Sequence, residues 1–307
     1  MSIGSDRWGV IYNPKAGTWL VKKRWKAIRE YMDTKHVSYD YFQSEGFGSV
    51  ERLARTLADN GYRTIVIVGG DGALNDAING IMSSNVEGKD DISIGIIPNG
   101  IANDFAKYWG MSWGYKDAVD RIIKGRRKKI DVGYVRYFNG KTHERRFFLN
   151  AVNIGLGARI VQMTDLMKRV WGLKLLYYIT AFFLLLFERK LYRMHLTING
   201  EHIHGRIMTV CAGNASGYGQ TPSAVPYNGY LDVSIIYRPQ LFQIVQGLVM
   251  LIRRRILNSE VVRIYRTKKI KVIRAKSAAV SLDGRLLAKR SPFEIGVKPE
   301  AITVIIP

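Results

Sequence analysis

The sequence predicts two domains: an α/β N-terminal domain with a parallel sheet, and a β-rich C-terminal domain that is antiparallel and sandwich-like. Up to about Ile130, strand-like apolar runs alternate with segments of helical periodicity, which is typical of a parallel α/β sheet. Beyond Ile130, short alternating strands are separated by glycine and asparagine turns. We expect domains at residues 1–130 and 131–298, and the pattern leaves open whether residues 299–307 return to the first domain.

In the first domain, the order of elements is strand, loop, helix, strand. Residues 64–68 are a continuous β-branched run, which is typical of a strand buried on both faces. Val50, Leu53 and Leu57 recur at helical spacing, and Gly61 is a natural stop for that helix. The expected strands are residues 7–12, 37–42, 64–68 and 92–97, and the expected helices are residues 20–32, 50–60 and 73–82.

The second domain is expected to contain mostly strands and two apolar segments. Residues 175–187 carry no charge but fall short of the ~20 apolar residues that a membrane span needs, so a buried or membrane-facing helix is expected. Residues 241–257 also read as a helix, either packed in the core or lying along an anionic membrane surface. The expected strands are residues 147–150, 194–198, 207–211, 231–237 and 270–273, and a last strand at 301–306 is not assigned to either domain.

Charge is the unusual property of the composition. Lys and Arg number 47 against 25 Asp and Glu, a net charge of +22. A charge of this size attracts polyanions, so an anionic membrane surface or phosphorylated substrates are the expected partners. Nucleic acid is the weaker candidate, because no recognition motif for it is present. The composition leaves the oligomeric state open, a homodimer included.

The single cysteine, Cys211, excludes an internal disulfide framework and an all-cysteine zinc site. It is expected to be a small buried residue and not a reactive thiol. A single cysteine fits a reducing cytoplasm. With the basic charge, this predicts a cytoplasmic protein that associates peripherally with the inner face of the membrane.

Three loops follow predicted strands and point to a phosphate-binding site. Gly69–Gly72 ends one buried strand and opens a helix, so its backbone can approach a ligand at a helix N-terminus. Pro98–Asp104 ends the next strand, and Asn13–Gly17 follows the first. Ligands of open α/β sheets bind beyond the carboxyl ends of the strands, where these loops should meet. Asp71 and Asp104 supply carboxylates suited to Mg²⁺.

These loops resemble those of the diacylglycerol kinase catalytic-domain family, which includes bacterial soluble lipid kinases and sphingosine kinases. The resemblance begins with Asn13-Pro14 and Gly17, continues through Gly69 to Asp76 and Pro98 to Phe105, and covers nearly the whole chain. Its motifs in the second domain are Ile130–Gly133, Phe148–Asn150 with Ile154-Gly155, Gly213-Asn214 to Gly219, Gly229 to Val233, and Asp283-Gly284 through Pro299.

The resemblance implies an ATP-dependent, Mg²⁺-dependent kinase that phosphorylates a lipid hydroxyl, with ATP in a cleft between the domains and the lipid entering from the second. It implies metal-organising roles for Asp71 and Asp104, with Asn228 as a weaker third position. The catalytic positions that it implies are Asp71, Asp104, Asp283 and Arg285. The nucleotide-binding positions are Asn13, Pro14, Lys15, Ala16, Gly17, Ser44, Gly69, Gly70, Asp71, Gly72, Ala73, Leu74, Asn75, Asp76, Ile101 and Asn103.

Four departures from the family pattern fall at these positions. Ala73 and Ile101 replace threonines near the phosphates, and Asn228 replaces an aspartate of a metal site. Arg285 stands where the family has the glutamate taken to be its general base, and an arginine cannot accept the proton. Asp283 is then a candidate replacement for the base.

Three functions follow from the sequence. The first is a lipid kinase acting on diacylglycerol, a sphingoid base, ceramide or a similar lipid. The second is a pseudokinase that binds nucleotide or lipid without turnover, in which Arg285 pairs with a phosphate or headgroup. The third is a soluble-metabolite kinase related to NAD kinases, which share the Gly-Gly-Asp-Gly loop.

Overall fold

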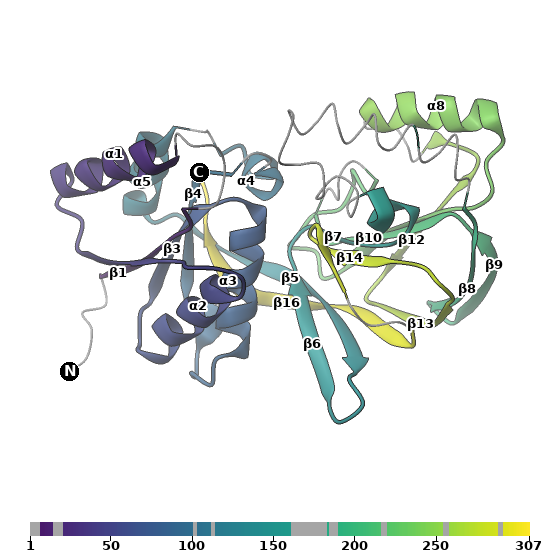
Figure 1. Cartoon of the computed structure of the whole chain (residues 1–307), viewed down its shortest axis with the longest axis horizontal. Helices are drawn as coiled ribbons and strands as arrows, with labels where there is room; N and C mark the ends of the chain where they lie inside the picture. The colour runs from purple at the N-terminus through teal and green to yellow at the C-terminus, as the bar shows by residue number, and fades with distance from the viewer. Residues whose placement is uncertain are drawn as a thin grey trace. The chain divides into compact units, whose positions relative to one another are not determined.

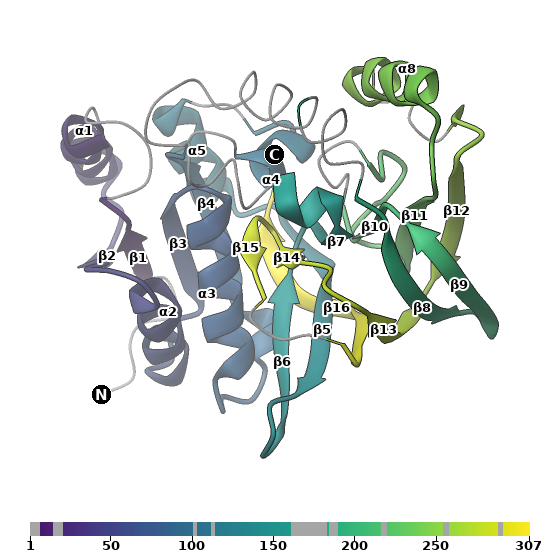
Figure 2. The same cartoon turned by 45° about the vertical axis from the view of Figure 1, so that its right-hand side comes forward.

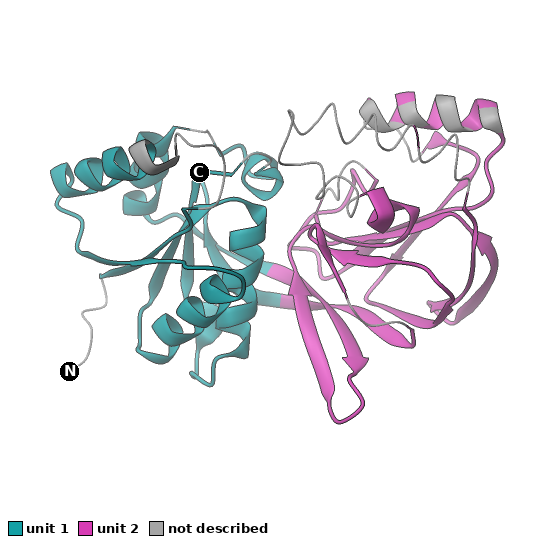
Figure 3. Ribbon diagram, in the orientation of Figure 1, with its two compact units in different colours: residues 1–130, 300–307 teal, residues 131–299 magenta. Residues whose placement is uncertain are grey.

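The computed structural model divides the chain into two compact units (Figure 3): Met1–Ile130 with Glu300–Pro307, and Asp131–Pro299. Two strands, β5 (Arg127–Phe138) and β16 (Phe293–Ile305), contribute residues to both units. The structure describes residues 7–14, 21–100, 103–111, 114–160, 183, 190–215, 220–253, 258–287 and 291–307.

The first unit contains the predicted parallel sheet, in the order β2-β1-β3-β4-β16 (Figures 1 and 2). Each neighbouring pair is parallel, and the end of β16 joins the sheet beside β4 through Thr303 and Val304. Strands β1, β3 and β4 are buried along their whole length, as the β-branched composition predicted. The strand bounds are β1 (Trp8–Tyr12), β2 (Tyr39–Gln43), β3 (Thr64–Gly69) and β4 (Ser93–Pro98).

Helices flank this sheet (Figure 2). Ile28 of α1 and Val119 of α5 share a core cluster with strand residues such as Val66. Helices α2 and α3 pack against each other. The helix bounds are α1 (Val21–Thr34), α2 (Ser49–Asp59), α3 (Asp71–Ser83), α4 (Asp104–Tyr108) and α5 (Tyr115–Lys124), with a 3₁₀ turn at Lys89–Asp91. Helices α4 and α5 were not predicted from the sequence.

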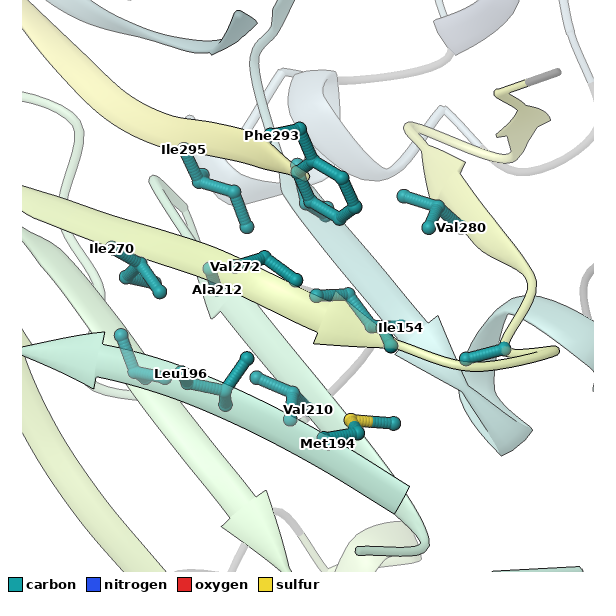
Figure 4. Packing of buried hydrophobic residues seen from close by; sticks show 14 of the residues in the cluster. Ile154, Met194, Leu196, Val210, Ala212, Ile270, Val272, Val280, Phe293 and Ile295 are labelled. Atoms are coloured by element: carbon teal, nitrogen blue, oxygen red, sulfur yellow. The ribbon is translucent and has the colours of Figure 1, made fainter. Parts of the chain in front are cut away.

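The second unit contains antiparallel strands in two sheets, which confirms the predicted sandwich-like class. One sheet runs β6-β5-β16-β13-β8-β9 and the other β12-β11-β10-β7-β14-β15. Their apolar faces form one core, part of which Figure 4 shows, including Leu196, Val210 and Phe293. The remaining bounds are β6 (His143–Phe148), β7 (Ala151–Gly155), β8 (Tyr192–Ile198), β9 (Glu201–Ile207), β10 (Thr209–Gly213), β11 (Leu231–Ile236), β12 (Val262–Thr267), β13 (Lys269–Ala275), β14 (Val280–Leu282) and β15 (Arg285–Leu286).

Two predicted elements of the second unit have different bounds in the structure, and most of a third predicted segment lies outside the described residues. The strand predicted at residues 207–211 is two strands, because β9 ends at Ile207 and β10 begins at Thr209. The predicted helix at 241–257 is observed as α8 (Leu241–Ile252). Apart from Phe183, the apolar segment 175–187 lies outside the described residues. Within the described residues, no helix combines the length and apolarity needed to cross a bilayer.

Cys211 lies fully buried in β10, which confirms the expectation of an inert residue. Burial raises the pKa of its thiol to about 12, against the opposing effect of a hydrogen bond with Thr221. The reactive thiolate is therefore absent at neutral pH. We expect Cys211 not to react with Ellman's reagent in native buffer at pH 8. One thiol per chain should react after unfolding in guanidinium. Reaction of the native protein at the rate of free cysteine would contradict this placement.

Candidate nucleotide site

The loops after neighbouring strands of the first unit meet at one edge of the sheet. Beyond the last paired residues of the strands, the backbone N–H of Asn13 donates to the Val68 carbonyl at 3.1 Å. The N–H of Asn99 donates to the Gly69 carbonyl at 2.9 Å. The N–H of Ser44 donates to the Tyr12 carbonyl at 2.9 Å. These bonds continue the sheet by one residue. They place the beginnings of the loops side by side at the carboxyl ends of the strands.

Two of the loops touch through their backbones at Gly70 and Gly100. A Cβ atom built on Gly100 would lie 2.4 Å from the Gly70 Cα atom, and one on Gly70 would lie 3.0 Å from the Gly100 Cα atom. Glycine is therefore required at residue 100 by contact with a second backbone. At Gly69, an added Cβ would lie 2.8 Å from the Cβ of Ala73, so the helix packs tightly on the strand end.

Asn103 fixes the shape of the second loop. Its Oδ1 atom accepts the Gly100 N–H at 3.1 Å, and its Nδ2 atom donates to the Gly100 carbonyl at 2.8 Å. The residue has a left-handed backbone (φ 51°), which asparagine tolerates better than most residues. Asn103 is buried, so the geometry gives it the task of closing the loop.

Asp71 connects the two loops. Its Oδ2 atom accepts the Asp104 N–H at 2.9 Å, and its Oδ1 atom accepts the Phe105 N–H at 3.0 Å. The carboxylate therefore satisfies the first donors of the short helix α4. The sequence indicated catalytic, nucleotide-binding and metal roles for Asp71 but not this structural one, because it depends on a contact between residues far apart in the chain.

The two aspartates form an electrostatically unfavourable pair. Burial raises the pKa of the Asp71 carboxyl, and the Asp104 carboxylate raises it further. The N–H donors of Phe105 and Asp104, and the Lys107 ammonium, oppose this rise. Charging Asp71 therefore costs free energy that a divalent cation would recover. Each carboxylate oxygen retains a lone pair beyond its hydrogen bond, so the donor set fits Mg²⁺.

Helix α3 supplies the remaining predicted positions from its first turns. It begins at Asp71, two residues earlier than expected, because the Leu74 N–H donates to the Gly70 carbonyl at 3.0 Å. A helix N-terminus directly after a glycine pair is suited to a phosphate. The next four predicted positions all have buried side chains, so they shape the site by packing: Ala73, Leu74, Asn75 and Asp76.

Asn99 is a candidate that sequence reasoning did not single out. Its side chain is buried, and its Nδ2 atom has no hydrogen-bond partner among the described residues. A buried donor without a partner is costly and is often reserved for a ligand. Its position between Pro98 and Gly100, within the predicted loop, was the available signal.

In the second unit, Asp283 and Gly284 form a hairpin turn. They are the two residues between β14 and β15, and both have positive φ values, 44° and 84°. Asp-Gly is a favoured pair for such a turn. The turn places Arg285, which is half-buried, at the start of β15.

The Asp283 carboxylate accepts three backbone N–H groups. Its Oδ2 atom accepts the Leu149 N–H at 2.6 Å, and its Oδ1 atom accepts the N–H groups of Asn150 and Ala151, both at 2.9 Å. The residue is also buried. These contacts give Asp283 a structural role in holding the chain, and its use as a replacement for the missing base stays a prediction.

The other motifs of the second unit form a network around this turn. The Asn214 Nδ2 atom donates to the carbonyls of Asp131 and Leu149 at 2.9 and 3.0 Å. The Asp131 Oδ2 atom accepts the Gly229 N–H at 2.6 Å. Residues that the resemblance identified at distant positions are thus held together by hydrogen bonds. Their spacing in the sequence reflects this framework.

The predicted metal role of Asn228 gains no support from its contacts. Its Oδ1 atom accepts the Tyr230 N–H at 2.9 Å, which closes a local turn. Within the described part of the chain, no group of three or more His, Cys, Asp or Glu side chains is arranged to hold a metal. Four predicted nucleotide-binding positions lie outside the described residues: Lys15, Ala16, Gly17 and Ile101.

This architecture, an α/β unit with glycine loops at its sheet edge joined to an antiparallel sandwich, is matched by two family models. Residues 7–135 match the diacylglycerol kinase catalytic domain, and residues 150–306 match the YegS C-terminal NAD kinase beta sandwich-like domain. The chain belongs to the diacylglycerol kinase-like family that these two domains define.

Relatives and solved structures agree with this assignment. The diacylglycerol kinase of Bacillus subtilis (strain 168) is 24% identical over 284 residues, covering 90% of this chain and 88% of the relative. That of Staphylococcus saprophyticus is 26% identical over 243 residues, covering 76% and 74%. A diacylglycerol kinase structure from Bacillus anthracis str. Sterne superposes with a TM-score of 0.70 at 17% identity, covering 99% of this chain and 98% of that one. Yeast NADH kinase complexed with NADH gives 0.54 at 11% identity, covering 98% and 84%.

Proposed function

We propose that this protein is an ATP-dependent lipid kinase that transfers the γ-phosphate of ATP to a lipid hydroxyl at a membrane surface. The observation that carries the proposal is the backbone contact between Gly70 and Gly100, which joins two glycine loops at the N-terminus of α3. Such an edge is suited to the phosphates of a nucleotide. The family supplies the acceptor class, since the relatives are named diacylglycerol kinases.

In this proposal, the chain's own residues bind and orient the phosphates. The N-terminus of α3 and the Asn99 amide donate to phosphate oxygens, and Asn103 keeps the second loop in shape. Asp71 and Asp104 would hold Mg²⁺, which would neutralise charge on the phosphates. The lipid oxygen bonds to the γ-phosphorus as the bond to ADP breaks, and the hydroxyl proton passes to solvent.

A proton passing to solvent is compatible with Arg285 at the position of the usual base. General-base catalysis is typically worth ~10²- to 10⁴-fold, so its absence slows turnover without abolishing it. The guanidinium would instead attract an anionic phosphate or headgroup. The relatives named above are described as kinases, which gives no support to the alternative of binding without turnover.

A turnover assay tests this function. Purified protein is incubated with Mg-ATP labelled at the γ-phosphate and with vesicles that contain diacylglycerol, ceramide, a sphingoid base or phosphatidylglycerol. We expect labelled lipid from one of these classes and ADP in equal amount. Absence of labelled lipid across all four, with ATP binding intact by calorimetry, would contradict the proposal. Labelling of NAD in a parallel reaction would point to the metabolite kinases.

Asp104→Asn separates catalysis from stability at this site. We expect phosphotransfer to fall about 10²-fold, because a carboxylate that organises Mg²⁺ is lost. The midpoint of urea unfolding at pH 7 should stay the same or rise slightly, because the repulsion that raises the Asp71 pKa is removed. The backbone N–H that bonds Asp71 is retained in this variant. Unchanged turnover would exclude Asp104 from the metal site.

A further inference from the structure

The outward face of one sheet in the second unit carries a dense array of cations. In β8, buried Met194, Leu196 and Ile198 alternate with residues that point away from the core. Figure 2 shows β9 and β13 on either side of β8, and their pairing, with one register shift in β13, puts outward residues of the three strands on one face. We call this surface the basic face and define it by Arg136, Arg145, Arg193, Arg206, Lys269, Lys271 and Arg274.

Register places the central cations of the basic face next to one another. Arg193 lies directly opposite Arg206 across β8 and β9. Arg274 of β13 lies opposite His195, whose ring is 5.1 Å from that of His204. The three arginines are exposed to solvent. Like charges paired across strands are destabilising, so their concentration here points to a partner that neutralises them.

The carboxylate that β16 contributes to the basic face is already paired with two cations. Glu294 of β16 is buried and pairs with Arg136 and with Lys269, both at 3.2 Å. In the described strands β8, β9 and β13, which lie beside β16, the one acidic residue is Glu201. It lies opposite the buried Ile198, and the Tyr265 hydroxyl donates to it at 3.3 Å. The basic face therefore keeps a large positive charge.

Apolar side chains are exposed beside these cations. Phe138 is the last residue of β5. It lies on the same side of the strand as Arg136 and is 55% exposed. Ile273 is 43% exposed at a register shift in β13, between Lys271 and Arg274. Exposed apolar side chains among cations are typical of surfaces that contact the headgroup region of a bilayer.

We propose that the basic face is the surface by which this protein docks on an anionic lipid bilayer. The proposal deepens the proposed function, which requires access to a lipid, but docking itself does not depend on phosphotransfer. Each basic residue near an anionic bilayer strengthens binding about fivefold. Binding to nucleic acid, the other polyanion, is measured in the same experiment.

The experiment measures vesicle binding in the absence of ATP. Full-length protein is sedimented with vesicles of phosphatidylcholine alone, or of phosphatidylcholine with 30% phosphatidylglycerol, at low and high salt. The test variant carries Arg193→Gln, Arg206→Gln and Arg274→Gln. The matched control removes three exposed arginines from the first unit by Arg52→Gln, Arg55→Gln and Arg63→Gln. Both variants change the net charge equally.

We expect binding that needs phosphatidylglycerol and weakens with salt. The test variant should lose about a hundredfold in partition coefficient, and the control should lose much less. Equal losses in the two variants, or no loss in the test variant, would overturn the proposal. So would normal vesicle binding by a test variant that has lost affinity for duplex DNA.

A second readout separates docking from the kinase reaction. With a short-chain lipid acceptor in neutral detergent micelles, the test variant should phosphorylate as fast as the unmodified protein. A variant that fails in micelles as well as on vesicles would place these arginines in the reaction itself and overturn the docking role. If the unmodified protein binds vesicles but labels no lipid, the proposed function fails while the docking surface stands.

Discussion

Gly100→Ala is expected to reduce phosphotransfer by at least ~10²-fold. The new methyl group would lie 2.4 Å from the Gly70 Cα atom and 2.8 Å from the Asn103 Oδ1 atom. Both neighbours are held: Gly70 by its place before α3, and Asn103 by its two bonds to Gly100. The loops must therefore separate, and displacements of about 1 Å in a positioning site cost this much in rate.

The loss should appear in ATP binding as well as in turnover. Overpacking of this kind also costs ~1–3 kcal/mol of stability, which urea unfolding measures. Gly70→Ala should be milder, because its closest contact is 3.0 Å. Gly46→Ala is the matched control, since an added Cβ there meets no atom within 4 Å. Normal turnover by Gly100→Ala would show that the two loops do not act together on the nucleotide.

Asp283→Ala is expected to destabilise the second unit by at least ~3 kcal/mol. The substitution removes the acceptor of three backbone N–H groups, those of Leu149, Asn150 and Ala151. A buried donor left without an acceptor costs ~1–3 kcal/mol each. Alanine also tolerates the positive φ of this turn less well than aspartate does. The free energy of unfolding in urea, followed by circular dichroism, measures the loss.

Two further variants decide what Asp283 does. Asp91→Ala is the control, because its carboxylate is 66% exposed and pairs with Lys129 at the surface, where such a pair is worth less than ~1 kcal/mol. Asp283→Asn keeps one oxygen acceptor and should be intermediate in stability. If Asp283 were the general base instead, Asp283→Asn would abolish turnover while leaving the unfolding midpoint unchanged. That result would support the predicted catalytic role.

The fold could be predicted from local patterns in the chain. The β-branched run at residues 64–68 required a strand buried on both faces, and the observed strand differs by one residue at its end. Helix α5 was missed although Ala118, Val119 and Ile122 have helical spacing, because the surrounding charges obscured the pattern. The break between Ile207 and Thr209 was missed because both sides of it are apolar and buried.

The site was predictable only to the level of its loops. Local patterns were enough to predict that glycine loops and carboxylates follow successive strands, since the order of strands along the chain and the residue types are read directly. The folded units were needed to show that Asp71 caps α4, that Gly100 touches Gly70, and that Asp283 holds three amides of a distant segment. Each of these depends on contacts between residues 30 to 134 positions apart. Such contacts are fixed by packing of the whole unit, which no local pattern records.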